Sequence, residues 1–296
     1  MKLFVTGANG YIGGSVAARL VQEGHHVRGL VRNPEKVAGV EAFGIEAVVG
    51  TLDDAALLTR EANAADGVIN AADSDSREAV DTFIAALAGS GKVFIHTSGS
   101  SIVGDNGNGE ANENVYDEDH LPAAEPDKIA RRAIDQAVVD AATQNIRSIV
   151  LCNTLIYGAT LGPPAESVQL PRIITDARQS GVAHYIGKGF NIYSNVYIGD
   201  AVDMYLLALQ AAPAGFFAFI ENGEASFKDM AQAIADSLGL GVAQSLPLDE
   251  AIAKWGYEVA TFALASNSRV RSVRTRPLGW QPSGPDVMEY LRGITA

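Results

Sequence analysis

The chain has 296 residues, 47% of them hydrophobic, and a formal net charge of −13, as in a globular protein with a large core. The acidic balance argues against a nucleic-acid partner, because phosphate binding needs a surface rich in lysine and arginine. The single cysteine, Cys152, excludes an internal disulfide framework and a cysteine-based zinc cluster. Since no secretory signal or membrane-length apolar run is recognisable, we expect a cytoplasmic protein without a membrane partner.

Short apolar runs alternate with helical patterns over the first half of the chain. Strands are expected at residues 2–6, 26–31, 46–49, 67–71, 93–97 and 147–151, and helices at 11–23, 54–64, 76–89 and 127–144. This alternation, with strands rich in Val and Ile, is typical of a buried parallel sheet covered by helices on both faces. We therefore predict an α/β fold with a Rossmann-type, doubly wound parallel sheet over residues 1–152.

The pattern changes at residue 153 to loops and short elements, with helices expected near 200–211, 227–238 and 284–292. We interpret residues 153–296 as a smaller C-terminal part that packs on the first, exchanges chain with it and forms one wall of a substrate cleft. The acidic stretch 105–125 is expected to be a solvated loop, because runs of like charge usually are. The alternative is a lid over the cleft.

A glycine-rich turn, TGANGYIG at residues 6–13, lies between the first expected strand and the first expected helix. Its glycines allow a tight turn and close approach of the backbone to a pyrophosphate, and the helix that follows directs its positive end at the phosphates. The strand–turn–helix context is the one that a dinucleotide site requires. The turn residues expected to bind the cofactor are Gly7, Asn9, Gly10, Tyr11, Ile12 and Gly13.

The end of the second strand distinguishes NADP from NAD. An NAD site has an acidic residue there that holds the ribose 2′-hydroxyl. This chain has Arg32 at that position, with Arg28 nearby and no acid between residues 27 and 33. Because a guanidinium suits a 2′-phosphate, we predict NADP(H) as the preferred cofactor, and NAD(H) stays the alternative.

The turn resembles the TGxxGxxG segment of the extended and atypical short-chain dehydrogenases/reductases, a family that includes nucleoside-diphosphate-sugar epimerases and dehydratases. Residues 50–54, 68–72, 96–105, 117–122, 155–158, 194–202 and 278–282 are similar to further segments of this family. The resemblance implies that Leu52 and Asp53 border the adenine, that Ala71 and Ala72 lie under the ribose, and that Thr97 ends the fifth strand beside the cofactor. The family often forms homodimers, so a homodimer is left open.

The catalytic pattern of the family is not intact in this chain. Family members use a Tyr-x-x-x-Lys pair, in which the lysine lowers the pKa of the tyrosine, and a Ser or Thr that polarises the substrate oxygen. Here Asp127 or Lys128 falls at the tyrosine position, and Arg131 or Arg132 falls at the lysine position. An arginine can hold a ribose or polarise a carbonyl, but it cannot exchange a proton near neutral pH.

Replacement groups are therefore needed. Gly99 stands where the family has its serine, so we expect Ser98 or Ser100 to polarise the substrate, with Tyr157 or Tyr116 as the proton donor. Tyr193 and Tyr197 are interpreted as part of the C-terminal wall, and His96 as a core histidine. No residue spacing indicates a metal site or a Ser/His/Asp arrangement.

Three functions follow from these residues. The first is an NADP(H)-dependent oxidoreductase or epimerase-like enzyme acting on the carbonyl or secondary alcohol of a small molecule, with a sugar nucleotide as one option. The second is a non-catalytic NADP(H) sensor, and the third is a dehydratase or isomerase with a tightly held cofactor. The arginines at 269, 271, 274 and 276 form either an anion site for a sugar nucleotide or a basic face that pairs with the acidic surface.

Overall fold

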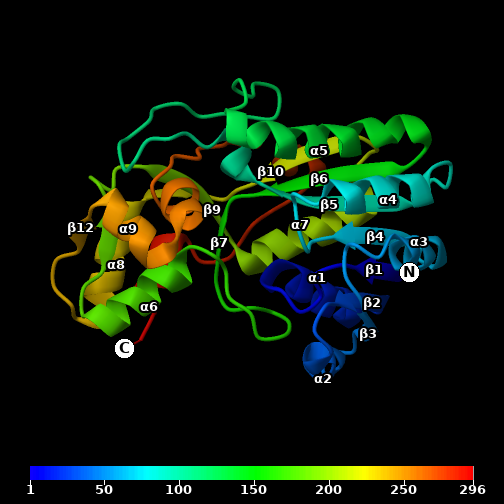
Figure 1. Cartoon of the computed structure of the whole chain (residues 1–296), viewed down its shortest axis with the longest axis horizontal. Helices are drawn as coiled ribbons and strands as arrows, with labels where there is room; N and C mark the ends of the chain where they lie inside the picture. The colour runs from blue at the N-terminus through cyan, green and yellow to red at the C-terminus, as the bar shows by residue number, and fades with distance from the viewer. Residues whose placement is uncertain (296) are drawn as a thin grey trace.

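The central sheet of the protein has seven parallel strands in the order β10-β6-β5-β4-β1-β2-β3 (Figure 1). A computed structural model describes residues 1–295. The strands are β1 (Lys2–Val5), β2 (His26–Val31), β3 (Glu46–Val49), β4 (Gly67–Asn70), β5 (Val93–Gly99), β6 (Arg147–Asn153) and β10 (Phe216–Ile220). The predicted doubly wound α/β fold is confirmed, and all six strands expected in the first half are present. The apolar run at 216–220 adds the seventh, beside β6.

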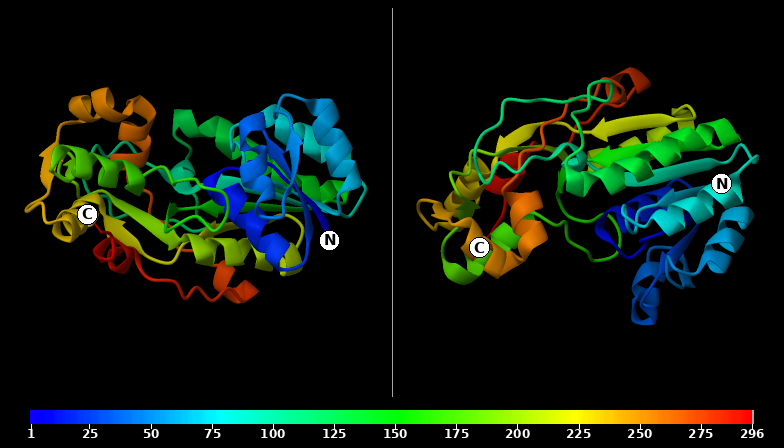
Figure 2. Two further views of the ribbon diagram at one scale, coloured as in Figure 1. Left: turned by 90° about the horizontal axis from the view of Figure 1, so that it is seen from below. Right: turned by 45° about the horizontal axis from the view of Figure 1, so that its top comes forward.

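Helices cover both faces of this sheet (Figure 2). They are α1 (Tyr11–Gln22), α2 (Val37–Glu41), α3 (Ala55–Ala64), α4 (Arg77–Leu87), α5 (Ile129–Asp140) and α7 (Ile198–Ala211). Strand side chains alternate between the faces, so Leu3 and Val5 join the core under α1 and α7, whereas Phe4 joins the core under α3, α4 and α5. Burial on both faces explains why these strands read as continuous apolar runs.

The second half of the chain builds the smaller body at the left of Figure 1, around its own apolar core. It has a sheet of order β11-β9-β7 and a pair β12-β8. Its elements are β7 (Leu155–Tyr157), α6 (Leu170–Ser180), β8 (His184–Ile186), β9 (Ile192–Tyr197), β11 (Glu224–Ser226), α8 (Phe227–Leu238), β12 (Gln244–Leu246), α9 (Leu248–Trp255), a π-helix (Val259–Leu264) and α11 (Val287–Arg292).

Three elements of the second half return to the central sheet. Helix α7 packs against α1, β10 pairs with β6, and α10 (Thr275–Leu278) contacts β10. The division of the chain at residue 152 stays a prediction. It separates two parts along the sequence, but residues from both parts build the central sheet and its helical layers. Short 3-10 helices complete the fold at Pro34–Lys36, Ser100–Val103, Pro126–Lys128 and Ala141–Gln144. Among residues 1–295, no helix has both the length and the apolar character needed to cross a bilayer.

The acidic stretch 105–125 is tied to residues 266–273, which run beside it along the top of Figure 1. The Asp105 carboxylate accepts a hydrogen bond from the backbone N–H of Asn267 at 2.8 Å. Buried Glu118 accepts hydrogen bonds from the N–H groups of Phe219 and Val273, both at 2.9 Å. The expectation of a solvated loop is therefore wrong for these two carboxylates, whereas Glu110, Glu113, Asp119 and Glu125 are exposed as expected.

Candidate functional site

A cavity of about 610 Å³ lies at the carboxyl ends of β1 to β4. In an open parallel sheet, this is the edge at which ligands bind. The glycine-rich turn supplies one wall, and the segments that follow β2, β3 and β4 supply the others. The lining residues are Gly7, Asn9, Gly10, Leu30, Arg32, Asn33, Lys36, Gly50, Thr51, Leu52, Asp53, Ala71, Ala72, Asp73 and Ser76.

The glycine turn fits the backbone to a phosphate group. Gly7 has a positive φ of 69°, and a Cβ atom there would lie 2.7 Å from the carbonyl oxygen of Ala71. Helix α1 begins after Gly10, and no side chain caps its first turn. The first backbone N–H groups of α1 are therefore available to an anion, which is the arrangement that a dinucleotide pyrophosphate needs.

The turn residues and strand ends predicted from the sequence divide into two groups. Eight of them line the cavity: Gly7, Asn9, Gly10, Arg32, Leu52, Asp53, Ala71 and Ala72. The other four lie outside its lining. The Tyr11 hydroxyl donates to the carbonyl of Gly158 at 2.8 Å, and the Thr97 hydroxyl is hydrogen-bonded to that of Tyr205 at 2.8 Å. Ile12 packs against the core, and Gly13 lies directly behind the turn.

A second cation, Lys36, lies beside Arg32 in the cavity wall. The side chain of Asn33 accepts a hydrogen bond from the N–H of Glu35 at 3.0 Å and starts the 3-10 helix Pro34–Lys36, whose last residue lines the same cavity as Arg32. Among the described residues 1–295, Arg32 forms no ion pair within 4.0 Å. Sequence reasoning missed Lys36, although the Asn-Pro turn that positions it is visible in the sequence.

A second cavity, of about 740 Å³, adjoins the first. The loop between β4 and α4 separates them, since Asp73 and Ser76 line the first cavity and Asp75 lines the second. The remaining lining comes from the ends of β5 and β6, the start of α5, β9, a loop before α6 and the π-helix. These residues are Gly99, Ser100, Ser101, Asp127, Lys128, Ala130, Arg131, Asn153, Thr154, Val168, Gln169, Tyr193, Glu258, Val259, Phe262 and Ala263. We call this space the substrate cavity.

The structure distinguishes the two arginines that could take the lysine position of the family. Arg131 faces the substrate cavity, where its Nε lies 2.7 Å from Asp75 Oδ1 and its Nη1 donates to Ser101 Oγ at 3.0 Å. The guanidinium holds the pKa of Asp75 below its usual range. Arg132 turns away and donates to the carbonyl of Pro122 at 2.6 Å. Arg131 is therefore the cation of this site.

The two residues predicted to fall at the tyrosine position of the family form an ion pair with each other. The carboxylate of Asp127 lies 2.6 Å from the Nζ of Lys128, and both residues line the substrate cavity. Lys128 is buried, with its Nζ 3.9 Å from the centre of the Phe262 ring. This pair fixes the start of α5 but supplies no phenol.

The four residues expected to be catalytic lie in different places. Ser100 lines the substrate cavity, and its hydroxyl is 2.8 Å from that of Ser268. Ser98 is buried and donates to Asp135 Oδ2 at 2.8 Å. Tyr157 donates its hydroxyl proton to the carbonyl of Pro285 at 2.7 Å, outside the cavity lining.

Tyr116, the fourth of these residues, pairs through its backbone with Val270 and packs against the core under α5. It does not line the cavity either. Tyr193, which the sequence placed only in the C-terminal wall, is buried and does line it. Burial raises the pKa of Tyr193 to about 12, with hydrogen bonding to Ser268 and Ser100 acting in the opposite direction. Ser101 was also missed, because the short helix after β5 turns it inward.

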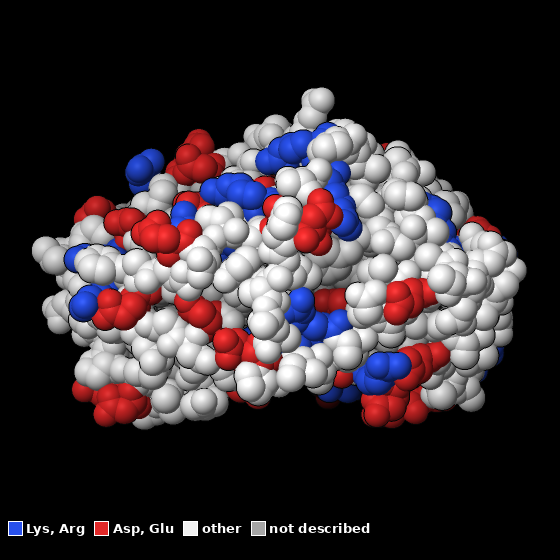
Figure 3. All heavy atoms as spheres, turned by 90° about the horizontal axis from the view of Figure 1, so that it is seen from above, with Lys and Arg blue, Asp and Glu red and all other residues white. Residues whose placement is uncertain are grey.

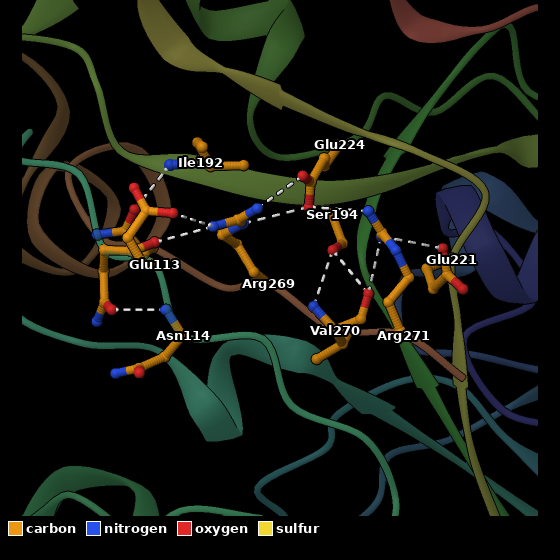
Figure 4. Close-up of polar contacts among 11 residues, drawn as sticks. Glu113, Asn114, Ile192, Ser194, Glu221, Glu224, Arg269, Val270 and Arg271 are labelled. Atoms are coloured by element: carbon orange, nitrogen blue, oxygen red, sulfur yellow. Dashed lines mark hydrogen bonds and ion pairs between the residues drawn. The ribbon is translucent and has the colours of Figure 1, made fainter. Parts of the chain in front are cut away.

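The arginine cluster near the C-terminus is paired with acidic residues (Figure 4). Arg269 lies 2.8 Å from Glu224, and only 13% of its side chain is exposed. Arg271 lies 3.1 Å from Glu224 and 3.5 Å from Glu221. Arg274 lies 2.6 Å from Asp119, whereas Arg276 donates to the side chain of Asn222, so the predicted pairing with acidic residues is confirmed for three of the four arginines. On the face shown in Figure 3, lysine and arginine likewise lie mostly beside Asp and Glu.

No group of three or more His, Cys, Asp or Glu side chains within residues 1–295 is arranged to hold a metal ion.

The structure offers two adjoining cavities, the first suited to a dinucleotide and the second to a small molecule with a polar oxygen. The site can bind an anion at the glycine turn and hold an oxygen between Arg131 and the serine hydroxyls.

The chain is similar to known enzymes over most of its length. The model of the NAD dependent epimerase/dehydratase family matches residues 3–216. The chain is 30% identical to the oxidase ucsJ of Acremonium sp, over 99% of this chain and 96% of the relative. It is 26% identical to the 4-hydroxy-2-methyl-3-oxo-4-farnesyl-3,4-dihydroquinoline-1-oxide ketoreductase of Stigmatella aurantiaca, over 75% of this chain and 69% of the relative.

A solved structure with the same fold is that of the UDP-glucose 4-epimerase of Thermotoga maritima. The TM-score is 0.78 at 18% sequence identity, and the superposition covers 99% of this chain and 96% of that chain. The family match is to NAD dependent enzymes, and the superposition shows that the fold is shared over nearly the whole chain.

Proposed function

The chain belongs to the NAD dependent epimerase/dehydratase family, and on that premise we propose that it is an NADP(H)-dependent reductase of a carbonyl group. It is an enzyme of the short-chain dehydrogenase/reductase type, which argues against the alternative of a non-catalytic sensor. A ketoreductase among its relatives supports reduction as the reaction. The observation that carries the proposal is the convergence of Arg131, Ser100, Ser101 and Tyr193 on a cavity that adjoins the dinucleotide cavity.

The cofactor cavity favours NADP(H) because Arg32 and Lys36 lie together where a ribose 2′-phosphate would be held. The first turn of α1 would hold the pyrophosphate, Leu52 and Asp53 would border the adenine, and Ala71 and Ala72 would lie under the ribose. When bound, NADPH would supply a hydride to the substrate carbon.

The substrate oxygen would lie between Arg131 and the hydroxyls of Ser100 and Ser101. These donors are fixed before substrate binds, because Arg131 is held by Asp75 and Ser100 by Ser268. Donors fixed in this way stabilise the negative charge that develops on a carbonyl oxygen during reduction. They also orient the carbonyl toward the cavity wall that adjoins the cofactor.

The proton for that oxygen would come from Tyr193. Arg131 does not release a proton near neutral pH, whereas the buried phenol of Tyr193 keeps its proton until pH about 12 and can donate it to an alkoxide. Of the four residues predicted to be catalytic, this mechanism retains Ser100. The hydroxyl of Ser98 donates to Asp135, and that of Tyr157 donates to the carbonyl of Pro285.

Titration of the purified protein with NADPH and NADH, followed by turnover with a panel of ketones and aldehydes, tests the proposal. We expect NADPH to bind about tenfold tighter or more, because each hydrogen bond to a charged group contributes about 1.5–3 kcal/mol. Tighter binding of NADH would contradict the cofactor assignment. Protein that purifies with a non-exchanging cofactor would instead favour the dehydratase or isomerase alternative.

A pair of matched variants tests the proton donor. Tyr193→Phe is expected to lower kcat by about 100-fold, the usual range for loss of a general acid. Tyr157→Phe removes a hydroxyl of the same kind outside the cavity and is expected to leave kcat nearly unchanged. The opposite ranking of the two variants would show that the assignment of Tyr193 is wrong.

A further inference from the structure

We propose that the substrate cavity binds a carbonyl compound with an apolar body, an alkyl or aryl ketone, in preference to a nucleoside-diphosphate sugar. This inference rests on the proposed reductase function and adds the class of substrate. Three properties of the cavity carry it: an apolar wall, the pairing of its cations, and the separation of polar and apolar residues.

The apolar wall is formed by the π-helix and the loop that faces it. Val259, Phe262 and Ala263 come from the π-helix, and Val168 comes from the loop before α6. The side chain of Gln169 donates to the carbonyl of Ala263 at 2.8 Å and joins the two segments into one surface. An apolar surface lining a cavity gains free energy when an apolar ligand covers it.

The charges of the cavity do not suit a diphosphate. Three carboxylates, those of Asp75, Asp127 and Glu258, line it together with two cations, Lys128 and Arg131. Each of these cations already contacts one of the carboxylates. A diphosphate would have to break these ion pairs or lie beside the carboxylates, and like charges at close range are unfavourable.

Cations outside the cavity are engaged in the same way. Arg269 and Arg271 are held by Glu221 and Glu224, as described above. Moving either arginine toward a phosphate would leave a half-buried carboxylate without its partner, which costs free energy. The arginine cluster therefore supports the fold of this wall and is not available to a phosphorylated substrate.

The serine and threonine hydroxyls and the apolar side chains of the substrate cavity come from different elements. Ser100, Ser101 and Thr154 come from the carboxyl ends of β5 and β6, next to Arg131. Val168, with 53% of its surface exposed, belongs to the outer loop. A ketone would therefore direct its oxygen toward the strand ends and its alkyl or aryl body toward Phe262 and Val168.

A homologous series of methyl ketones, from 2-butanone to 2-octanone, tests the inference by steady-state kinetics with NADPH. Burial of a methylene contributes up to about 0.8 kcal/mol, so kcat/KM should rise about two- to fourfold with each added methylene. Binding is measured separately, by calorimetric titration of 2-octanol and of UDP into protein loaded with NADP⁺. We expect 2-octanol to bind and UDP to show no binding at millimolar concentration.

Two valine variants provide a matched comparison. Val168→Asp adds a charge to the apolar wall and should weaken 2-octanol binding roughly five- to tenfold, because apolar contact is lost and the charge must stay hydrated. Val242→Asp makes the same change at a valine that is 78% exposed and lies outside both cavities. It should leave 2-octanol binding unchanged, and both variants should keep the NADPH affinity of the parent.

The outcomes separate the inference from the proposed function. Binding of 2-octanol without turnover of any ketone would overturn the reductase proposal and support the apolar cavity. Turnover that is independent of ketone length, submillimolar binding of UDP, or equal effects of the two valine variants would overturn the inference. Absence of binding by both 2-octanol and UDP would also overturn it.

Discussion

The guanidinium of Arg131 and the carboxylate of Asp75 form an ion pair in the lining of the substrate cavity, with Nε 2.7 Å from Oδ1. The same guanidinium donates to Ser101 at 3.0 Å. Helix α5 is thus tied to the loop between β4 and α4, which lines the cofactor cavity on its other side. Arg131 is therefore a planar cation with a fixed direction, and substitution by lysine would not preserve its geometry.

Arg131→Lys is expected to lower kcat by about 10- to 100-fold with a smaller change in the Kd of NADPH. A lysine keeps the charge but loses the forked contact with Asp75 and Ser101, so the substrate oxygen loses a fixed donor. Stopped-flow turnover and fluorescence titration measure the two quantities. Arg132→Lys, at an arginine bonded to Pro122 outside the cavity, serves as the control. Equal loss of kcat in both variants would contradict the role of Arg131.

Removal of the two cations at the end of β2 should change the cofactor preference. Arg32→Ala and Lys36→Ala are each expected to weaken NADPH binding by about tenfold, which corresponds to about 1.4 kcal/mol, because each removes a partner of the 2′-phosphate. NADH lacks this phosphate, so its Kd should hardly change and serves as the internal control. A parallel loss of affinity for both cofactors would mean that these residues act on the fold of the loop instead.

The glycine turn should tolerate little change in volume. A Cβ atom at Gly13 would lie 2.5 Å from the carbonyl oxygen of Gly7 and 2.8 Å from that of Thr6. Because both are backbone atoms that cannot move aside, Gly13→Ala is expected to destabilise the protein by about 1–3 kcal/mol in urea unfolding. Gly39→Ala, where a Cβ atom would meet nothing within 4 Å, should be neutral or stabilising. A stable Gly13→Ala variant would show that the backbone of the turn can relax.

The fold was predictable because it depends on local periodicity, whereas the substrate cavity depends on residues far apart in the chain. Strand β5 and helix α5 follow from apolar runs and spacing that the sequence displays directly. Tyr193, Phe262 and Arg131 meet only after the second half has folded back over the strand ends. Tyr157 shows the converse: it follows β6 as the family pattern implies, yet its hydroxyl bonds to Pro285, 128 residues later. Hydrogen-bond partners at this separation have no signal in a single sequence.

Two buried titratable groups, Asp135 on α5 and His96 on β5, lie behind the site, with His96 Nε2 3.8 Å from Asp135 Oδ1. Burial raises the pKa of Asp135 from 3.8 to about 7 and lowers that of His96 from 6.5 to about 4. Between pH about 4 and 7 the folded state binds a proton at Asp135 that the unfolded state lacks, so this group makes stability fall as the pH rises. His96 does the opposite between pH about 4 and 6.5, because only the unfolded state binds its proton.

The two slopes oppose each other, so we expect the free energy of unfolding of the parent protein to vary little between pH about 5 and 6.5. Asp135→Asn removes the contribution to stability that falls with pH and keeps a hydrogen-bond partner for Ser98. The free energy of unfolding of this variant should therefore rise by at most about 2 kcal/mol as the pH increases from about 5 to 6.5. His96→Gln removes the contribution that rises with pH, so the free energy of unfolding of this variant should fall by a similar amount over the same pH increase. Urea unfolding at several pH values measures all three proteins. Parallel pH profiles for the parent and Asp135→Asn would show that Asp135 is ionised in the folded state, and that the space between β5 and α5 is more polar than the contacts of Ser98 and His96 imply.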